Sequence, residues 1–308
     1  MIVEGETETD SWAVDPRRFT DHVDQAYVTA KAIETYSHEY AMHFPQIQWP
    51  AGRKAKVSPL YDRLAAAGAE FGSYGGWERA DWFPKHDADR RPANSYDRQH
   101  WFDAVGEECR HVAAHAGILE LTGFSRFHLT GKGAADWLAS LVTGNLPKVG
   151  RIGLIYFASP KGKILTEMTA TRIAEDEFLL ITGAGAYWHD RDLLNGYLPD
   201  SGEADSGDIS LRDITRDVAT LLVTGPKSPA IIAAATGKSA ASTDFPWLSF
   251  QSCQIANCDA TAIRVSFAGE VGWEIHCNMA DIVAVYDAIM AAGAPHNLGH
   301  FGMLALDS

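Results

Sequence analysis

Hydrophobic residues recur with a helical period near the start of the chain. Between Asp21 and His43 the apolar and aromatic positions lie three or four residues apart, which predicts a long amphipathic helix with one buried stripe. The stripe consists of Val23, Ala26, Tyr27, Ala30, Ile33, Tyr36 and Tyr40. From Phe44 to about Asn94, prolines and the string G-G-W-E-R-A-D-W-F interrupt any period. Because aromatic residues at this density need burial, we expect a loop-rich connector that lies against a neighbouring domain.

The remainder of the chain repeats one local order, in which an apolar strand ends in Thr-Gly and continues into a helix. The three copies are Phe127–Leu141, Phe178–Leu194 and Thr220–Ala235. Further strands are predicted at Leu154–Phe157, Met168–Ile173 and Ala262–Phe267, and a last helix at Asp281–Ala292. Strands and helices therefore alternate along this part of the chain.

Two of these copies contain glycine pairs that follow a strand and open a helix, as in a dinucleotide-binding fold. The third glycine of that motif is replaced by Asp136 in one copy and by Trp188 in the other. A bulky residue there prevents the close packing of helix on strand that the motif needs. The sequence therefore contains no fingerprint of its own for a flavin or a nicotinamide.

The string R-V-S-F-A-G-E-V-G-W-E-I-H, from Arg264 to His276, predicts a β-hairpin with Glu270 on a sharp turn. Phe267 lies on the incoming strand and Trp273 on the return strand. A carboxylate beside two aromatic rings suits a flat heterocycle with adjacent N–H donors, such as the 2-amino-4-oxo edge of a pterin. A solvated surface acid is the alternative interpretation.

A second acid, Glu167, lies in the middle of the strand predicted after the P-K-G-K turn. If its side chain points inward, burial raises its pKa and makes it a candidate proton acceptor or hydrogen-bond anchor. If it points outward, it is an ordinary surface acid. The spacing alone favours the outward orientation.

The composition narrows the class of protein. The chain has 308 residues, 46% of them hydrophobic, which is enough for one large domain or two ordinary ones. The sequence contains no run of about 18 apolar residues, which a membrane-spanning helix would need. Its first residues are acidic, whereas a targeting peptide would be basic, so we expect a cytoplasmic protein. A net charge of −14 without a basic cluster argues against a nucleic-acid partner.

The cysteine and histidine spacings predict no metal site. The four cysteines show no C-x-x-C pair, so we expect reduced, buried thiols. His111 and His115 are four residues apart on a predicted helix, but Val112 stands where a zinc protease motif needs Glu. We interpret both histidines as surface residues.

Several motifs together resemble the folate-binding region of dimethylglycine and sarcosine dehydrogenases, which is itself similar to the glycine-cleavage T-protein. They are G-W-E-R-A-D-W-F, in which the family usually has Pro in place of Ala80, L-P-K-V-G, P-K-G-K, F-L-L-I-T-G-A-G, V-T-G-P and F-A-G-E-V-G-W-E-I. The resemblance spans almost the whole chain. It implies an α+β, T-protein-like cloverleaf of three lobes, preceded by a helix and a wrapped linker from a flavoenzyme.

The resemblance also implies a site for tetrahydrofolate. Glu270 matches the glutamate that contacts the pterin, and Phe267 stands where the T-protein has Tyr. Phe267 and Trp273 would complete the cofactor-binding set. Glu167 matches the catalytic aspartate near N5 and N10 of the folate, with one more methylene. The implied reaction captures a one-carbon unit from a small N-methylated amine as 5,10-methylenetetrahydrofolate.

Departures from the family lead us to expect a middle fragment. We expect residues 1–95 to be a remnant of the flavoprotein portion plus linker, and residues 96–308 to be the folate-binding domain with an incomplete third lobe. FAD would then bind only in a missing N-terminal portion or in a flavin-containing partner. Two alternatives remain: an independent folate-dependent demethylase of a sulfonium, methoxyl or quaternary amine substrate, and a non-catalytic folate-binding or assembly subunit.

Overall fold

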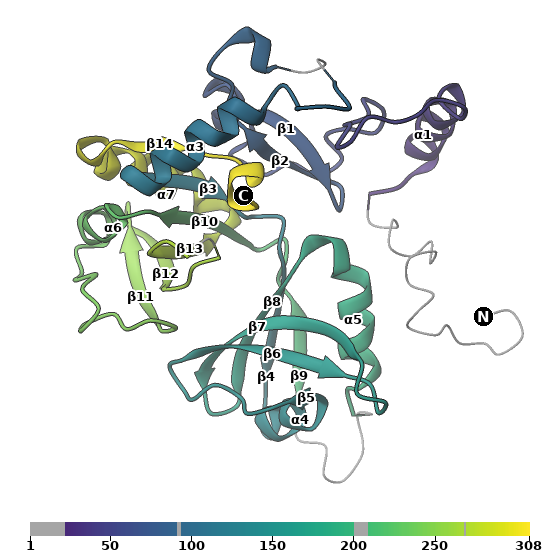
Figure 1. The fold of residues 1–308 in the computed structure, drawn as a ribbon. Coiled ribbons are helices and arrows are strands. Elements are labelled where there is room, and N and C mark those ends of the chain that lie inside the picture. The colour runs from purple at the N-terminus through teal and green to yellow at the C-terminus, as the bar shows by residue number, and fades with distance from the viewer. Residues whose placement is uncertain (1–21, 91–93, 200–208, 268) are drawn as a thin grey trace, which may run out of the picture. The chain divides into compact units, whose positions relative to one another are not determined.

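The computed structural model describes residues 22–90, 94–199, 209–267 and 269–308 (Figure 1). The described residues form two compact units. The first unit contains residues 123–216, and the second contains residues 22–122 together with residues 217–308. The expected flavoprotein strand at Met1–Gly5 lies outside the described residues.

The first unit is an antiparallel sheet covered on one face by two helices (Figure 1). Its strand order is β5-β6-β7-β8-β4-β9. The strands are β4 (Ser125–Thr130), β5 (Val142–Thr143), β6 (Ile152–Ala158), β7 (Ile164–Ala174), β8 (Glu177–Thr182) and β9 (Ser210–Asp213). Helices α4 (Ala134–Leu141) and α5 (Tyr187–Gly196) bury Leu138 and Leu194 against Phe127, Phe178 and Leu180.

The second unit contains another six-stranded sheet, with the order β11-β12-β13-β10-β3-β14. The strands are β3 (Ala116–Glu120), β10 (Val218–Thr224), β11 (Phe250–Ile255), β12 (Cys258–Ile263), β13 (Gly272–Asn278) and β14 (Leu298–His300). All neighbours are antiparallel except β14 and β3, which are parallel.

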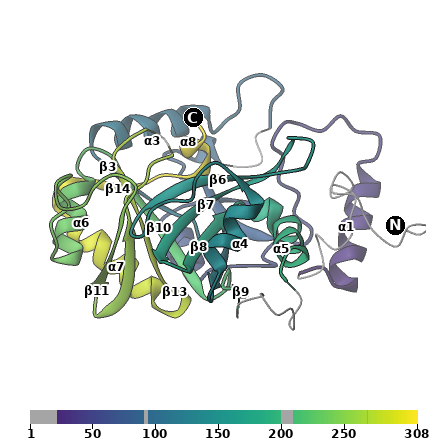
Figure 2. The same ribbon diagram turned by 90° about the horizontal axis from the view of Figure 1, so that it is seen from below.

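Helices cover both faces of this second sheet. Helices α6 (Ser228–Thr236) and α7 (Ile282–Gly293) pack together at one side of this sheet (Figure 2). The face that they cover carries Trp273 and Ile275. Helix α3 (Phe102–Ala114) lies on the other face, where Gly117 leaves room for Val112 and Phe301, since a Cβ at Gly117 would lie 2.6 Å from Val112. The short helix α8 (Met303–Leu306) packs against α3.

The predicted strand–helix repeats are confirmed. The three copies form β4–α4, β8–α5 and β10–α6, and the predicted last helix forms α7. Each copy buries its helix against its own strand, which explains why a local hydrophobic pattern was sufficient to find it.

The predicted loop-rich connector is wrong in part, because it contains regular structure. Helix α2 (Tyr61–Ala66) is followed by a hairpin of β1 (Glu70–Tyr74) and β2 (Trp77–Trp82). The string G-W-E-R-A-D-W-F supplies β2, in which Ala80 and Trp82 are buried. Its expected burial against neighbouring structure is confirmed, since Leu60, Leu64 and Ala80 belong to the core of the second unit.

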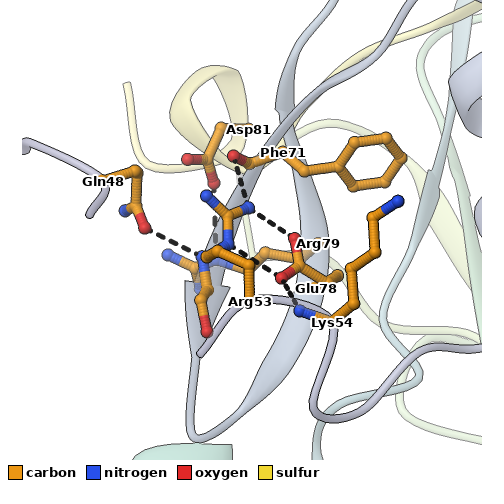
Figure 3. A network of polar contacts seen from close by, with 8 residues as sticks. Gln48, Arg53, Lys54, Phe71, Glu78, Arg79 and Asp81 are labelled. Carbon is orange, nitrogen blue, oxygen red and sulfur yellow. Dashed lines mark hydrogen bonds and ion pairs between the residues drawn. The ribbon is translucent and has the colours of Figure 1, made fainter. Parts of the chain in front are cut away.

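A polar network holds the segment around Arg53 on this hairpin (Figure 3). The Arg53 guanidinium donates to both carboxylate oxygens of Glu78 and, at 3.0 Å, to the carbonyl oxygen of Phe71. Glu78 also accepts a bond of 2.7 Å from the backbone N–H of Lys54. Because the Glu78 side chain is only 1% exposed, these donors compensate a buried charge.

Helix α1 (Gln25–Ser37) is shorter than predicted and buries none of its residues. Asp24 caps it by accepting 2.7 Å from the backbone N–H of Tyr27. Ile33 and Tyr36 of the predicted stripe are 68% and 79% exposed. The expected burial of this stripe is therefore wrong, since α1 buries none of its residues. Tyr27 of the stripe and the polar residue Glu34 are half-buried against residues 51–52.

Candidate functional site

Glu167 lies in the middle of β7, on the face of the first sheet that points away from its core. Its neighbours Met168 and Ala170 alternate into the core, whereas Glu167 itself is exposed. The predicted outward orientation is confirmed. The residue directly opposite on β6 is Tyr156, so a carboxylate and a phenol share one face of the sheet.

A buried acid supports the strands beside Glu167. The Thr182 hydroxyl donates 2.7 Å to Oδ2 of Asp190, and it lies 3.5 Å from the carbonyl oxygen of Glu167. Asp190 is 0% exposed, and its Oδ1 lies 2.8 Å from Nδ1 of His189. Helix α5 therefore anchors the end of β8 next to the Glu167 backbone.

Glu270 lies on the connection between β12 and β13. These strands pair in antiparallel register, so the predicted hairpin is confirmed. The turn is longer than expected, because β12 ends at Ile263 and β13 begins at Gly272. Glu270 is half-buried in this loop, and the ring of Phe267 is 57% exposed. A carboxylate and an accessible aromatic ring therefore lie on one loop.

Three donors fix the end of this loop. The carbonyl oxygen of Val271 accepts bonds from Gly225 N at 2.9 Å, from Ser228 Oγ at 3.0 Å and from Thr224 Oγ1 at 3.2 Å. The backbone beside Glu270 is thus attached to the turn that joins β10 to α6. Such attachment restricts the backbone next to Glu270.

Trp273 differs from the expectation that its ring faces a ligand. It alternates onto the core face of β13, where it is fully buried and packs edge-on against Phe245 at 6.2 Å between ring centroids. The guanidinium of Arg264 lies 5.3 Å from the Trp273 ring centroid. Among the described residues, the buried Trp273 Nε1 and Arg264 Nε have no hydrogen-bond partner. The Trp273 ring therefore supports the loop from behind.

The four predicted site residues fall into two groups. Phe267, Glu270 and Trp273 lie together on one loop and strand of the second unit, whereas Glu167 belongs to the first unit. Each group therefore lies on a different sheet and its loops.

A buried polar chain on β13 and β10 was not predicted. His276 Nε2 lies 2.9 Å from Oε2 of Glu274, and His276 Nδ1 lies 3.0 Å from the Thr220 hydroxyl. All three residues are at most 6% exposed. The alternation W-E-I-H in the sequence places Glu274 and His276 on one face of a strand. This pattern could have predicted that the two polar side chains lie next to each other.

No group of three or more His, Cys, Asp or Glu side chains suited to a metal ion is found in the part of the chain that the structure describes. The four cysteines are free thiols. None of the described helices has the length and apolar character needed to cross a membrane.

Comparison with known families identifies the chain. Residues 60–308 match the GCVT N-terminal domain, and residues 4–58 match the FAD dependent oxidoreductase central domain. The chain belongs to the GCVT family. The match to this family begins at residue 60, upstream of position 96, where we expected the folate-binding region to start.

The chain is similar over its whole length to two mitochondrial dehydrogenases and a bacterial oxidase. It is 32% identical to human mitochondrial dimethylglycine dehydrogenase, 31% identical to the formaldehyde-forming 4-methylaminobutanoate oxidase of Paenarthrobacter nicotinovorans, and 28% identical to human mitochondrial sarcosine dehydrogenase. The alignments cover 100% of this chain but only 35%, 37% and 37% of those proteins. The chain thus spans about a third of the length of these relatives.

A solved structure confirms the fold. The aminomethyltransferase T of the glycine cleavage system from Bartonella henselae matches with a TM-score of 0.65 and 23% identity, over 82% of this chain and 61% of that one. The predicted α+β, T-protein-like fold is therefore confirmed.

Proposed function

We propose that this chain binds tetrahydrofolate and serves as the one-carbon transfer region of an oxidative N-demethylase similar to dimethylglycine and sarcosine dehydrogenases. The observation that carries the proposal is that a half-buried Glu270 carboxylate and an exposed Phe267 ring lie on the connection between β12 and β13, whose end at Val271 is attached to the turn before α6. Membership of the GCVT family supports it.

The residues of this loop fit the pterin of a folate. A carboxylate accepts two parallel hydrogen bonds from the adjacent N–H donors of a 2-amino-4-oxo heterocycle. The exposed face of Phe267 offers a surface on which a flat ring can stack. Glu270 would therefore orient the pterin, Phe267 would cover one side of it, and the buried Trp273 ring would hold the loop in shape.

Bound tetrahydrofolate would supply a nucleophilic nitrogen that takes up the one-carbon unit of the oxidised amine, an iminium, as 5,10-methylenetetrahydrofolate, with release of the demethylated amine. Glu167, which matches the aspartate of the T-protein, would accept the proton released when the new bond forms. This assignment rests on the family resemblance, because the outward orientation of Glu167 by itself indicates an ordinary surface acid. Its negative charge would also stabilise a cationic amine. The oxidation of the amine requires a flavin, which we assign to a flavin-containing domain or subunit.

Calorimetric titration with folinic acid, a stable reduced folate, tests the binding step. The wild-type chain should bind saturably, and Glu270→Ala should weaken binding about 10-fold or more, because hydrogen bonds to a charged group contribute roughly 1.5–3 kcal/mol. Glu107→Ala, which removes an exposed carboxylate from α3 of the same unit, is the matched control and should bind like the wild type. Equal binding by wild type and Glu270→Ala would contradict the proposed role of Glu270.

A further inference from the structure

A cluster of one lysine and two histidines lies beside the Glu270 loop and has no role in the function proposed above. It consists of Lys227, His115 and His111, at the meeting point of the C-terminal end of α3 and the turn before α6. We propose that Lys227 and His115 form a binding site for a carboxylate group.

The backbone fixes the two side chains relative to each other. Lys227 N donates 2.9 Å to the carbonyl oxygen of His115. Two residues earlier, Gly225 has φ +106°, and a Cβ there would lie 2.6 Å from the carbonyl oxygen of Val112. Only glycine therefore permits this approach of the turn to the end of α3. The cluster is built by close packing.

The hydrogen bond between the side chains determines which donors remain available. Lys227 Nζ lies 2.9 Å from His115 Nδ1. An ammonium group only donates, so Nδ1 accepts and the neutral ring carries its proton on Nε2. Burial, Lys227 and His111 together lower the pKa of His115, which keeps the ring in this neutral form near pH 7. His115 Nε2–H and the remaining N–H groups of Lys227 can then donate to a ligand.

The charge of the cluster is uncompensated by carboxylates. Within the described residues, no acidic side chain forms an ion pair with Lys227, although the chain contains 40 acidic residues and has a net charge of −14. His111 Nε2 is already bonded, at 2.8 Å, to the carbonyl oxygen of Asn297. Lys227 and His115 are both partly exposed, so an anion can reach them.

The cluster is linked mechanically to Glu270. Gly225 and Ser228, on either side of Lys227, both donate to the carbonyl oxygen of Val271, next to Glu270. A carboxylate bound at Lys227 would therefore lie at the same edge of the sheet as the proposed pterin site. Two molecules of the proposed reaction carry a carboxylate, namely the glutamyl end of the folate and an N-methylated amino acid. The identity of the carboxylate rests on the proposed function, whereas its binding at Lys227 does not.

Titration of the full chain with p-aminobenzoyl-L-glutamate, followed through the NMR signals of the histidine rings, tests this site. We expect a saturable shift of the His115 signal, while the buried His276 signal stays unchanged. Lys227→Gln should weaken binding roughly tenfold, because one charge-assisted hydrogen bond is lost. Lys227→Arg should retain most of it. The control Lys238→Gln, which removes an exposed charge from the same unit, should bind like the wild type.

A parallel titration with dimethylglycine distinguishes the two sources of the carboxylate. A Lys227-dependent shift with only one of the two ligands supports the site and identifies its ligand class. No saturable shift of His115 with either ligand, in a chain shown to be folded, overturns the proposal, and so does a shift that Lys227→Gln leaves intact. Folinic acid binding that depends on Glu270 but not on Lys227, together with no Lys227-dependent shift by dimethylglycine, also overturns it and leaves the proposed function standing. A Lys227-dependent shift without any binding of folinic acid supports the carboxylate site and contradicts the proposed function.

Discussion

At the residue scale, the two aromatic residues near Glu270 lie in different environments. Phe267 lies in the loop after β12 and is 57% exposed, whereas Trp273 lies on β13 and is fully buried. The sequence predicted that both rings would flank a ligand. It could not separate them, because the strand that carries Phe267 ends four residues earlier than its pattern of polar and apolar residues predicts.

Substitution of these two rings should therefore have opposite effects. Phe267→Ala should weaken folinic acid binding about fivefold to tenfold and change the free energy of unfolding by less than about 0.5 kcal/mol, because an exposed ring contributes little to the core. Trp273→Ala should cost roughly 3–5 kcal/mol of stability, since it leaves a cavity in the core. Calorimetry and chemical denaturation measure the two quantities. Loss of stability in Phe267→Ala would contradict the assignment.

Glu167 is the residue for which a kinetic effect is expected. Glu167→Gln keeps the shape of the side chain but removes its basicity, so folinic acid binding should remain within about twofold of the wild type. Formation of 5,10-methylenetetrahydrofolate, assayed with a flavin-containing oxidase supplied separately, should fall about 100-fold or more. Glu167→Asp, which restores a carboxylate, should recover part of this rate. An unchanged rate in Glu167→Gln would exclude Glu167 as the base.

At the element scale, local patterns predicted the strand–helix repeats but not the hairpin of β1 and β2. The repeats bury their own helices, so their hydrophobic periods are complete within about fifteen residues. The hairpin lies between prolines, and β2 is a strand of only six residues whose burial depends on residues far along the chain. The parallel pairing of β14 with β3 is likewise a long-range contact that no local pattern contains.

Glu108 connects elements in the same way and makes stability depend on pH. Its buried carboxylate accepts 2.6 Å from Phe83 N, after β2, and 2.8 Å from Gly302 N, before α8. Burial raises the pKa of Glu108 to about 7 from a usual value of 4.5. The folded state therefore holds a proton that the unfolded state releases, so stability should be highest at low pH and fall as the pH rises through 7.

This contribution amounts to roughly 2.5 kcal/mol between pH 5 and pH 8. Chemical denaturation of the wild type at both pH values, compared with Glu108→Gln, isolates it, because other titrating groups are common to both proteins. Glu108→Gln should be less stable at pH 5 yet show a smaller loss of stability on going to pH 8. Parallel pH profiles of the two proteins would contradict a titrating Glu108.

At the scale of the whole molecule, the sequence predicted the family and the fold but not which surfaces are covered. The helical period of α1 was correct, yet Ile33 and Tyr36 are exposed, because a period reveals which face of a helix is apolar and not what lies against it. The pairing of Arg53 with Glu78 could not be predicted from a local sequence pattern either, since these residues are twenty-five positions apart. This pair joins the two stretches that match different families, residues 4–58 and residues 60–308.

Removal of this pair should destabilise the molecule strongly. Arg53→Ala leaves the Glu78 carboxylate, 1% exposed, without its main partner and should cost about 3–5 kcal/mol. Arg63→Ala is the matched control, because Arg63 pairs with Asp287 at side-chain exposures of 54% and 49% and should contribute less than about 1 kcal/mol. Urea denaturation compares the two variants. Equal stability of the two would show that solvent screens the Glu78 charge.

The three bonds to the carbonyl oxygen of Val271 have a consequence for exchanging parts between members of the family. These bonds attach the end of the Glu270 loop, at Val271, to the turn of residues 224–228, although the two segments are distant in sequence. A chimera that receives only one of these segments from a relative would combine the loop of one protein with the turn of another, and the bonds between them would be lost or distorted. The two segments should therefore be exchanged together. Ligand preference should be transferred from one relative to another only when a chimera receives both segments from the same protein.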